Sequence, residues 1–188
     1  MKKKTTAWAL LIVGLFVALA SCTKEKTATP DDPNIVYVNA NRSYPMLPAV
    51  LYTDSIDLNN DGLCELKMQY ENVAGDTGVV EMGQWHQPLQ IAVDGNLPYF
   101  YAKVYKSGDA MSTSSAIYQS PVYMSIKASG YRLGLVSGEG YFVFRFSTGT
   151  KFQYGWMRVS VSSTYNEFKI LDYAYSLLPE TPIAVGAK

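Results

Sequence analysis

The chain has 188 residues, of which 16 are basic and 16 acidic, so its formal net charge is zero. This length suits one globular domain with a full-sized core. Basic residues are scattered singly from Arg42 to Lys169. This pattern lacks the clustered positive charge of a nucleic-acid-binding protein, and we therefore expect no nucleic-acid partner.

The first 22 residues have the pattern of an export signal. Lys2, Lys3 and Lys4 precede an apolar run from Ala7 to Ala20 that is too short to span a bilayer. The ending Leu19-Ala20-Ser21-Cys22 resembles the cleavage box of bacterial lipoproteins. The resemblance implies that residues 1–21 are removed and that Cys22 is lipidated, palmitate included, which makes the membrane a partner. An ordinary signal peptide or a membrane anchor, with a coincidental cysteine, is the alternative.

The next segment, residues 22–34, reads as a flexible tether because it is polar, contains proline and has no hydrophobic periodicity. Thr23 is not the aspartate that retains Gram-negative lipoproteins in the inner membrane. Lys24-Glu25 is similar to the signal that follows the lipidated cysteine in surface lipoproteins of the Bacteroidota, although Lys26 stands where that signal has a second acid. We therefore expect an outer-membrane, lipid-anchored protein, with exposure at the cell surface.

The rest of the chain, residues 35–188, has short β-rich runs separated by turn residues about every ten positions. Together with 15 tyrosines, which suit half-buried strands, this spacing predicts an all-β domain: an antiparallel β-sandwich, jelly-roll-like in arrangement. The expected strands are Ile35–Val38, Leu51–Ile56, Leu63–Tyr70, Val79–Met82, Leu89–Val93, Tyr99–Tyr105, Ile117–Lys127, Tyr131–Val136, Tyr141–Ser147, Phe152–Val161 and Glu167–Tyr175.

The clearest pair is Tyr141–Ser147 with Phe152–Val161, joined by Thr148-Gly149-Thr150 as a hairpin. Alternation predicts a core side and a solvent side for both strands. The residues expected on the core side are Phe142, Phe144, Phe146, Met157, Val159 and Val161.

The segment from Asp57 to Glu65 is the one constellation with metal-ligand spacing. Oxygen side chains occupy positions 1, 3, 5 and 9, glycine occupies position 6, and a backbone carbonyl at position 7 completes the pattern of a calcium loop. Position 12 is Met68, so the loop is not an EF-hand; it resembles the calcium loops between strands of integrin-type repeats. A plain Asn-Asp-Gly turn without metal is the alternative. The candidate ligands of a structural calcium ion are Asp57, Asn59, Asp61, Leu63 and Glu65.

The C-terminal part carries Tyr154-Gly155-Trp156, then Asp172-Tyr173-Ala174-Tyr175, then Pro182-Ile183 and Gly186. This succession is similar to the ending of a group of uncharacterised secreted bacterial β-sandwich proteins, which often carry a D-x-N-x-D-G loop near their start. The resemblance supports the fold and implies no catalytic residue. From the residues themselves, we expect Trp156 and Tyr154 to be packing anchors rather than ligand contacts.

No catalytic set is recognisable. The sole histidine, His86, has no partner nearby in sequence. If Cys22 is lipidated, Cys64 has no cysteine left to pair with, and we expect it to be an unpaired, small buried hydrophobe rather than a reactive thiol. We therefore expect a non-enzymatic surface lipoprotein that serves as a binding or structural module, its partner a glycan or a surface protein. A glycan-binding module is the alternative, with Trp85, Tyr99 and Tyr101 as candidate ligand contacts. A glycan hydrolase is less favoured, because the acidic residues outside the loop form no motif.

Overall fold

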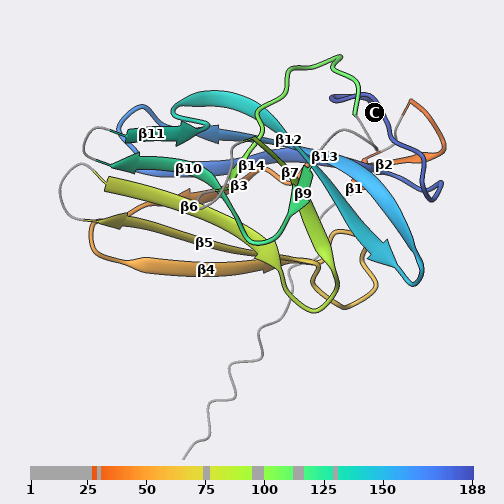
Figure 1. Ribbon diagram of the computed structural model, residues 1–188, viewed down its shortest axis with the longest axis horizontal. Helices are drawn as coiled ribbons and strands as arrows, with labels where there is room; N and C mark the ends of the chain where they lie inside the picture. The colour runs from red at the N-terminus through yellow and green to blue at the C-terminus, as the bar shows by residue number, and fades with distance from the viewer. Residues whose placement is uncertain (1–26, 29–30, 74–76, 95–99, 112–116, 129–130) are drawn as a thin grey trace, which may run out of the picture.

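The computed structural model describes residues 27–28, 31–73, 77–94, 100–111, 117–128 and 131–188. All the regular structure in these residues is β (Figure 1). The strands are β1 (Thr27–Ala28), β2 (Ile35–Val38), β3 (Arg42–Pro45), β4 (Leu51–Ile56), β5 (Leu66–Val73), β6 (Thr77–Gln84), β7 (Leu89–Asp94), β8 (Tyr101–Ala102), β9 (Ile117–Gln119), β10 (Val122–Ala128), β11 (Tyr131–Gly134), β12 (Gly138–Thr148), β13 (Lys151–Val161) and β14 (Glu167–Ser176).

The strands form one continuous path in the order β1-β2-β14-β13-β12-β7-β8-β10-β6-β5-β4. Strands β3, β9 and β11 pair with β14, β7 and β10 beside this path. Pairing is antiparallel except between β8 and β10. Two meanders, β4-β5-β6 and β12-β13-β14, belong to the two halves of the sheet, and β7, β8 and β10 lie between them along the path.

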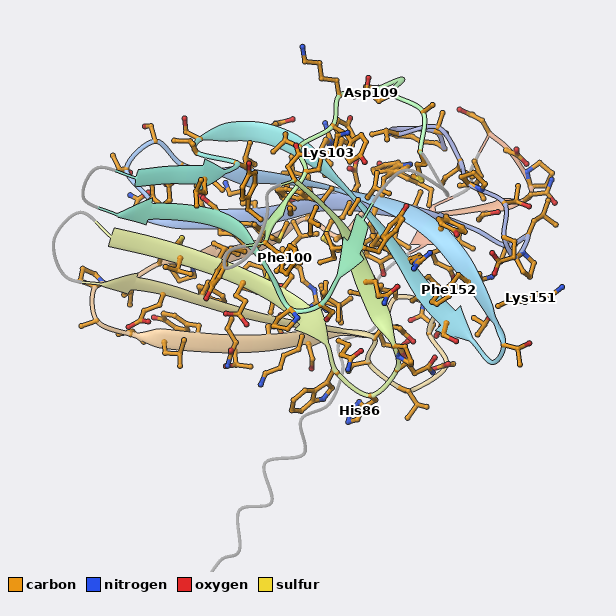
Figure 2. All side chains as sticks on the ribbon, viewed as in Figure 1. His86, Phe100, Lys103, Asp109, Lys151 and Phe152 are labelled. Atoms are coloured by element: carbon orange, nitrogen blue, oxygen red, sulfur yellow. The ribbon has the colours of Figure 1, made fainter. Side chains whose placement is uncertain are left out.

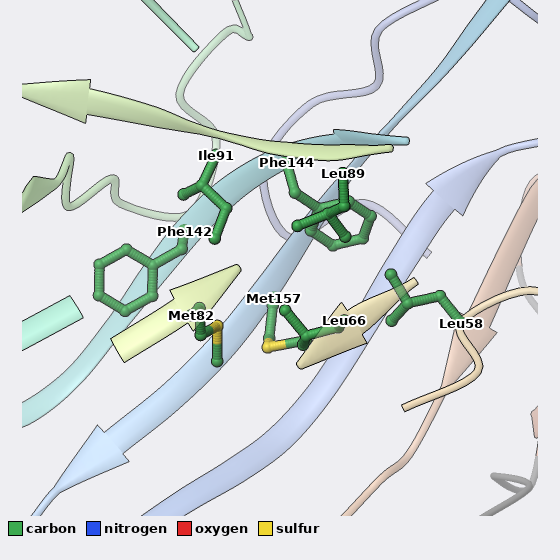
Figure 3. Close-up of a pocket in the computed structure, with 8 residues that line it drawn as sticks. All are labelled: Leu58, Leu66, Met82, Leu89, Ile91, Phe142, Phe144 and Met157. Atoms are coloured by element: carbon green, nitrogen blue, oxygen red, sulfur yellow. The ribbon is translucent and has the colours of Figure 1, made fainter. Parts of the chain in front are cut away.

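The two halves pack face to face across an apolar core. Phe142 and Phe144 of β12 and Met157 of β13 line a small internal cavity together with Leu66 of β5 and Met82 of β6 (Figure 3). The cavity measures about 10 Å³ and its lining is apolar, so it is suited neither to a ligand nor to an ordered water. This packing confirms the all-β fold class and is consistent with a β-sandwich.

The reverse face of β12–β13–β14 is partly covered as well, which corrects the expectation of an open solvent side, although Arg145 and Arg158 remain half-exposed. Val143, Ala174 and Trp156 belong to a second apolar cluster, in which Trp156 is 1% exposed. The C-terminal segment covers this cluster: Val185 belongs to it, and the indole Nε1 of Trp156 donates a hydrogen bond of 3.2 Å to the carbonyl of Ala187. Trp156 is therefore the packing anchor that its sequence context suggested.

Most expected strands are present, with shifted ends. Ile35–Val38 and Leu51–Ile56 match β2 and β4. The expected strand Ile117–Lys127 is divided into two strands, β9 and β10, by Ser120-Pro121. Proline has no backbone N–H and so cannot donate a hydrogen bond to a neighbouring strand. The expected strand Tyr99–Tyr105 is reduced to the two residues of β8. Strand β3 was not expected at all.

The expected tether, residues 22–34, is described at residues 27–28 and 31–34, and these residues make specific contacts with the domain. Strand β1 pairs with β2, and the backbone N–H of Asp32 donates to the carbonyl of Lys188. The signal segment 1–21 and Cys22 lie outside the described residues. In the described part of the chain, no helix has the length and apolar character needed to cross a membrane.

Candidate metal centre

The segment from Asp57 to Glu65 forms the loop between the antiparallel strands β4 and β5. Two of its residues have left-handed backbone conformations, Asn60 with φ 61° and Gly62 with φ 95°. Asparagine and glycine are the residues that adopt this region most readily, so the local sequence suits the sharp turn. Leu58 is fully buried in the core and anchors the loop to the sandwich.

Three carboxylates of the loop converge. One oxygen each from Asp57, Asp61 and Glu65 lie within 4.8 Å of one another. Asp57 and Glu65 are both 0% exposed, whereas Asp61 reaches solvent. Two buried acids at this separation repel each other strongly unless a positive charge lies between them.

Backbone N–H groups orient the carboxylates toward the interior of the loop. The N–H groups of Asp61 and Gly62 donate to the two oxygens of Asp57, at 3.2 and 2.8 Å. Leu63 N–H donates to Asp61 Oδ1, at 2.8 Å. The N–H of Leu58 donates to Glu65 Oε2, at 2.6 Å. These bonds hold the loop in shape and leave other carboxylate lone pairs available for a cation.

Burial, neighbouring negative charges and hydrogen bonds shift the pKa values of the carboxylates in this cluster. Burial, and then the charges of Asp61 and Asp57, raise the pKa of Glu65 to about 7. Desolvation alone would raise the pKa of Asp61, but hydrogen bonds from Leu63, Asn59 and Gln87 hold it below its ordinary value. The effect extends to Tyr175 of β14, whose pKa is raised to about 12 by burial and by the three carboxylates.

The residues present fit a metal ion. Glu65 Oε1 is buried and has no hydrogen-bond partner among the described residues. In the same part of the chain, no lysine or arginine forms an ion pair with Asp57, Asp61 or Glu65. An orphaned buried carboxylate oxygen beside two further carboxylates is the environment that a bound cation neutralises. The cluster can therefore hold a metal ion, and its all-oxygen donors suit a hard cation.

The neighbouring β6–β7 loop supports this centre, which local sequence reasoning missed. Its residues Trp85 and His86 donate backbone hydrogen bonds, each of 3.0 Å, to the carbonyls of Glu65 and Cys64. Gln87 donates a side-chain hydrogen bond of 2.9 Å to Asp61 Oδ2. His86 lies at the outer edge of the molecule (Figure 2). These partners are 20 or more positions away in sequence, so no local pattern could have identified them.

Two of the three expected aromatic ligand contacts, Trp85 and Tyr101, are among the described residues and lie apart. Trp85 follows β6 and is 43% exposed. Tyr101 of β8 is half-buried and pairs with Tyr123 of β10, which itself pairs with Glu81 of β6. Four strand residues, roughly 13 Å, separate Glu81 from Trp85. Tyr99 lies outside the described residues.

Cys64 is fully buried, as expected, but it is not an unpaired thiol. It is disulfide-bonded. The sequence has one further cysteine, Cys22, which lies outside the described residues. The burial of Cys64 is therefore confirmed and its assignment as an unpaired hydrophobe is wrong.

Comparisons with protein-family models, with curated proteins and with solved structures found no match. The function is therefore argued from the residues and their geometry alone.

Proposed function

We propose that this chain is a non-enzymatic lipoprotein of a bacterial outer membrane, exposed at the cell surface, in which a β-sandwich binding or structural module is stabilised by a calcium ion in its β4–β5 loop. The observation that carries the calcium site is the buried, unpartnered Oε1 of Glu65 beside the carboxylates of Asp57 and Asp61. The export signal and the box before Cys22 support the location.

Calcium suits this loop better than other common metals. The loop offers up to five oxygen donors, among them the amide of Asn59 and the backbone carbonyl of Leu63, and calcium accepts six to eight oxygens in flexible geometry. Magnesium usually keeps several waters and binds one or two carboxylates. Structural zinc sites are built mainly from cysteine and histidine.

The ion would act as a structural support rather than in catalysis. Glu65 and Asp57 are fully buried, so they cannot reach a substrate. Extracellular modules bind calcium with dissociation constants of roughly 10⁻⁴ to 10⁻³ M. At about 1 mM calcium, binding with a constant of about 10⁻⁴ M stabilises the folded state by about 1.4 kcal/mol.

Lipidation is tested by expressing the full chain in a Gram-negative host grown with labelled palmitate. We expect label in the outer-membrane fraction and none in a Cys22→Ser variant. External protease should remove the domain from intact cells, as a surface location requires. Label retained by the serine variant, or equal fractionation of both proteins, would refute the lipid anchor; protection from protease would refute surface exposure.

A lipidated cysteine cannot also be a disulfide cysteine, because its sulfur is held in a thioether. Lipidation of Cys22 and a disulfide between the two cysteines of one chain are therefore alternatives. The lipoprotein proposal requires the first for the membrane-bound protein, whereas the disulfide at Cys64 corresponds to a chain that is not lipidated through its second cysteine.

A further inference from the structure

A polar hollow lies on the outer face of the β5–β6 half of the sandwich. It measures about 190 Å³. Its lining comes from β5, from β6 and from the turn between β9 and β10. The residues that line it are Lys67, Gln69, Glu81, Met82, Gly83, Gln84, Ser120 and Pro121.

The backbone explains why the surface is hollow there. Lys67 pairs with Gly83 and Gln69 pairs with Glu81 across β5 and β6, so these side chains share the outer face. Gly83 adds no side chain to this row, and a Cβ there would lie 3.1 Å from the Cβ of Pro121. The side chains of Lys67, Gln69 and Glu81 therefore surround a position at which Gly83 has no side chain.

The functional groups in the hollow are available to a ligand. Among the described residues, the amide of Gln69 and the carboxylate of Glu81 have no side-chain hydrogen bond or ion pair. The ammonium of Lys67 lies 4.5 Å from the centroid of the Trp85 ring. Lys67 and Glu81 have opposite charges, so the hollow as a whole is neutral. A neutral site with an acid, an amide and an amine suits a ligand rich in hydroxyl groups rather than an anion.

Trp85 adds an apolar surface next to these polar groups. It follows Gln84 directly, and its ring is 43% exposed, with Lys67 over one face. The apolar face of a sugar ring packs on an exposed indole while its hydroxyls bond to neighbouring polar side chains. A smaller hollow of about 60 Å³ shares Glu81 and Pro121 and reaches Tyr123, which provides room for a chain to continue.

We infer that this hollow is a saccharide subsite that binds one uncharged sugar ring of a longer glycan. Glu81 and Gln69 accept and donate hydrogen bonds to the hydroxyls of this ring. Trp85, roughly 13 Å along the strand from Glu81, contacts a neighbouring ring of the same glycan. The volume is below the roughly 300 to 1,000 Å³ of pockets for drug-sized ligands, so one ring is the unit that fits. The inference rests on the proposed role as a binding module at the cell surface and names the ligand class.

The test is calorimetric titration of the full-length protein in detergent with soluble neutral glucan, mannan, galactan and xylan, and with anionic polygalacturonate. We expect at least one neutral polysaccharide to bind. Trp85→Ala should weaken that binding roughly tenfold or more, as loss of an aromatic anchor does. Glu81→Gln, which keeps the shape and removes the charge, should weaken it several-fold to about tenfold.

Glu71→Gln is the matched control. Glu71 lies on the same outer face of β5, but it does not line the hollow, so its variant should bind like the wild type. No binding to any neutral polysaccharide, binding to polygalacturonate alone, or wild-type affinity in both Trp85→Ala and Glu81→Gln would overturn the inference. Palmitate labelling and calcium melts do not depend on this surface, so a negative result here leaves the proposed function separately testable.

Discussion

Substitution of Glu65 by glutamine tests the metal centre most directly, because it removes one negative charge and almost no volume. In the absence of a cation, the buried carboxylates of Asp57 and Glu65 lie within 4.8 Å of each other. Above the pKa of Glu65, which is about 7, both carboxylates are ionised, and at an effective dielectric constant of about 20 their repulsion is about 3 kcal/mol. Glutamine removes this repulsion, and its carbonyl oxygen can still accept the hydrogen bond from Leu58 N–H. In chelator, Glu65→Gln should therefore unfold at or above the melting temperature of the wild type.

Calcium should stabilise the wild type by more than it stabilises Glu65→Gln, which narrows the difference between the two proteins. With a dissociation constant of about 10⁻⁴ M, 1 mM calcium stabilises the wild type by about 1.4 kcal/mol. For a domain of this size that corresponds to about 3 to 6 °C. If Glu65→Gln weakens binding about tenfold, the same calcium concentration adds about 0.4 kcal/mol, or about 1 to 2 °C.

The assay is thermal unfolding followed by circular dichroism, for both proteins, in 1 mM calcium, in 1 mM magnesium and in chelator. Magnesium should shift the wild type less than calcium does. Glu167→Gln, a variant of an exposed acid outside the loop, should respond to calcium like the wild type. Superimposable wild-type curves with calcium and with chelator would refute the calcium site. A full calcium shift in Glu65→Gln would show that Glu65 is not a ligand.

Three further predictions concern the core and the cysteines. Leu58→Ala should cost about 3 to 5 kcal/mol in urea unfolding, because it enlarges an existing apolar cavity. Gly155→Ala should cost more than about 2 kcal/mol, since its Cβ would lie 2.5 Å from the carbonyl oxygen of Ala174 and from the ring of Phe144. Protein extracted from membranes with its lipid should take up one alkylating group at Cys64 under denaturing, non-reducing conditions, because a thioether on the other cysteine prevents a disulfide within the chain.

Each of these has a control. Leu178→Ala, at an exposed leucine, should change the free energy of unfolding by less than about 0.5 kcal/mol. Leu58→Ala keeps the N–H that bonds to Glu65, so its calcium-induced shift should persist; loss of that shift would mean that the side chain positions the loop. Wild-type stability in Gly155→Ala would show that β13 and β14 can separate slightly at that point. Absence of alkylation in lipid-bearing protein would contradict the thioether.

The sequence predicted the carboxylate cluster that could hold a metal ion, because Asp57, Asp61 and Glu65 lie within nine consecutive residues. Local turn residues such as Asn60 and Gly62 shape the loop, and alternation along single strands predicts the face of Phe142 and Phe144 that enters the core. These features depend on backbone geometry over a few residues. That is the range in which composition and spacing determine structure.

Other features required the tertiary structure. The reverse face of β13 is partly covered because the C-terminal segment folds over Trp156, and no pattern within the strand shows which distant segment will cover it. Lys67 and Gln69 are polar residues two positions apart, which predicts that they share an outer face of β5. The sequence does not show the hollow, however, because it forms where Gly83 of the neighbouring strand lies against Pro121.

The sequence by itself therefore determined the all-β class, the loop with its oxygen donors and the lipoprotein-like N-terminus. Only the tertiary structure decided that Glu65 is buried with an orphaned oxygen, that Gln87 supports Asp61, and that the aromatic candidates are spread along an outer face. The physical reason is that burial and contact depend on which strands pair and which layers meet, and these are interactions between residues far apart in the chain.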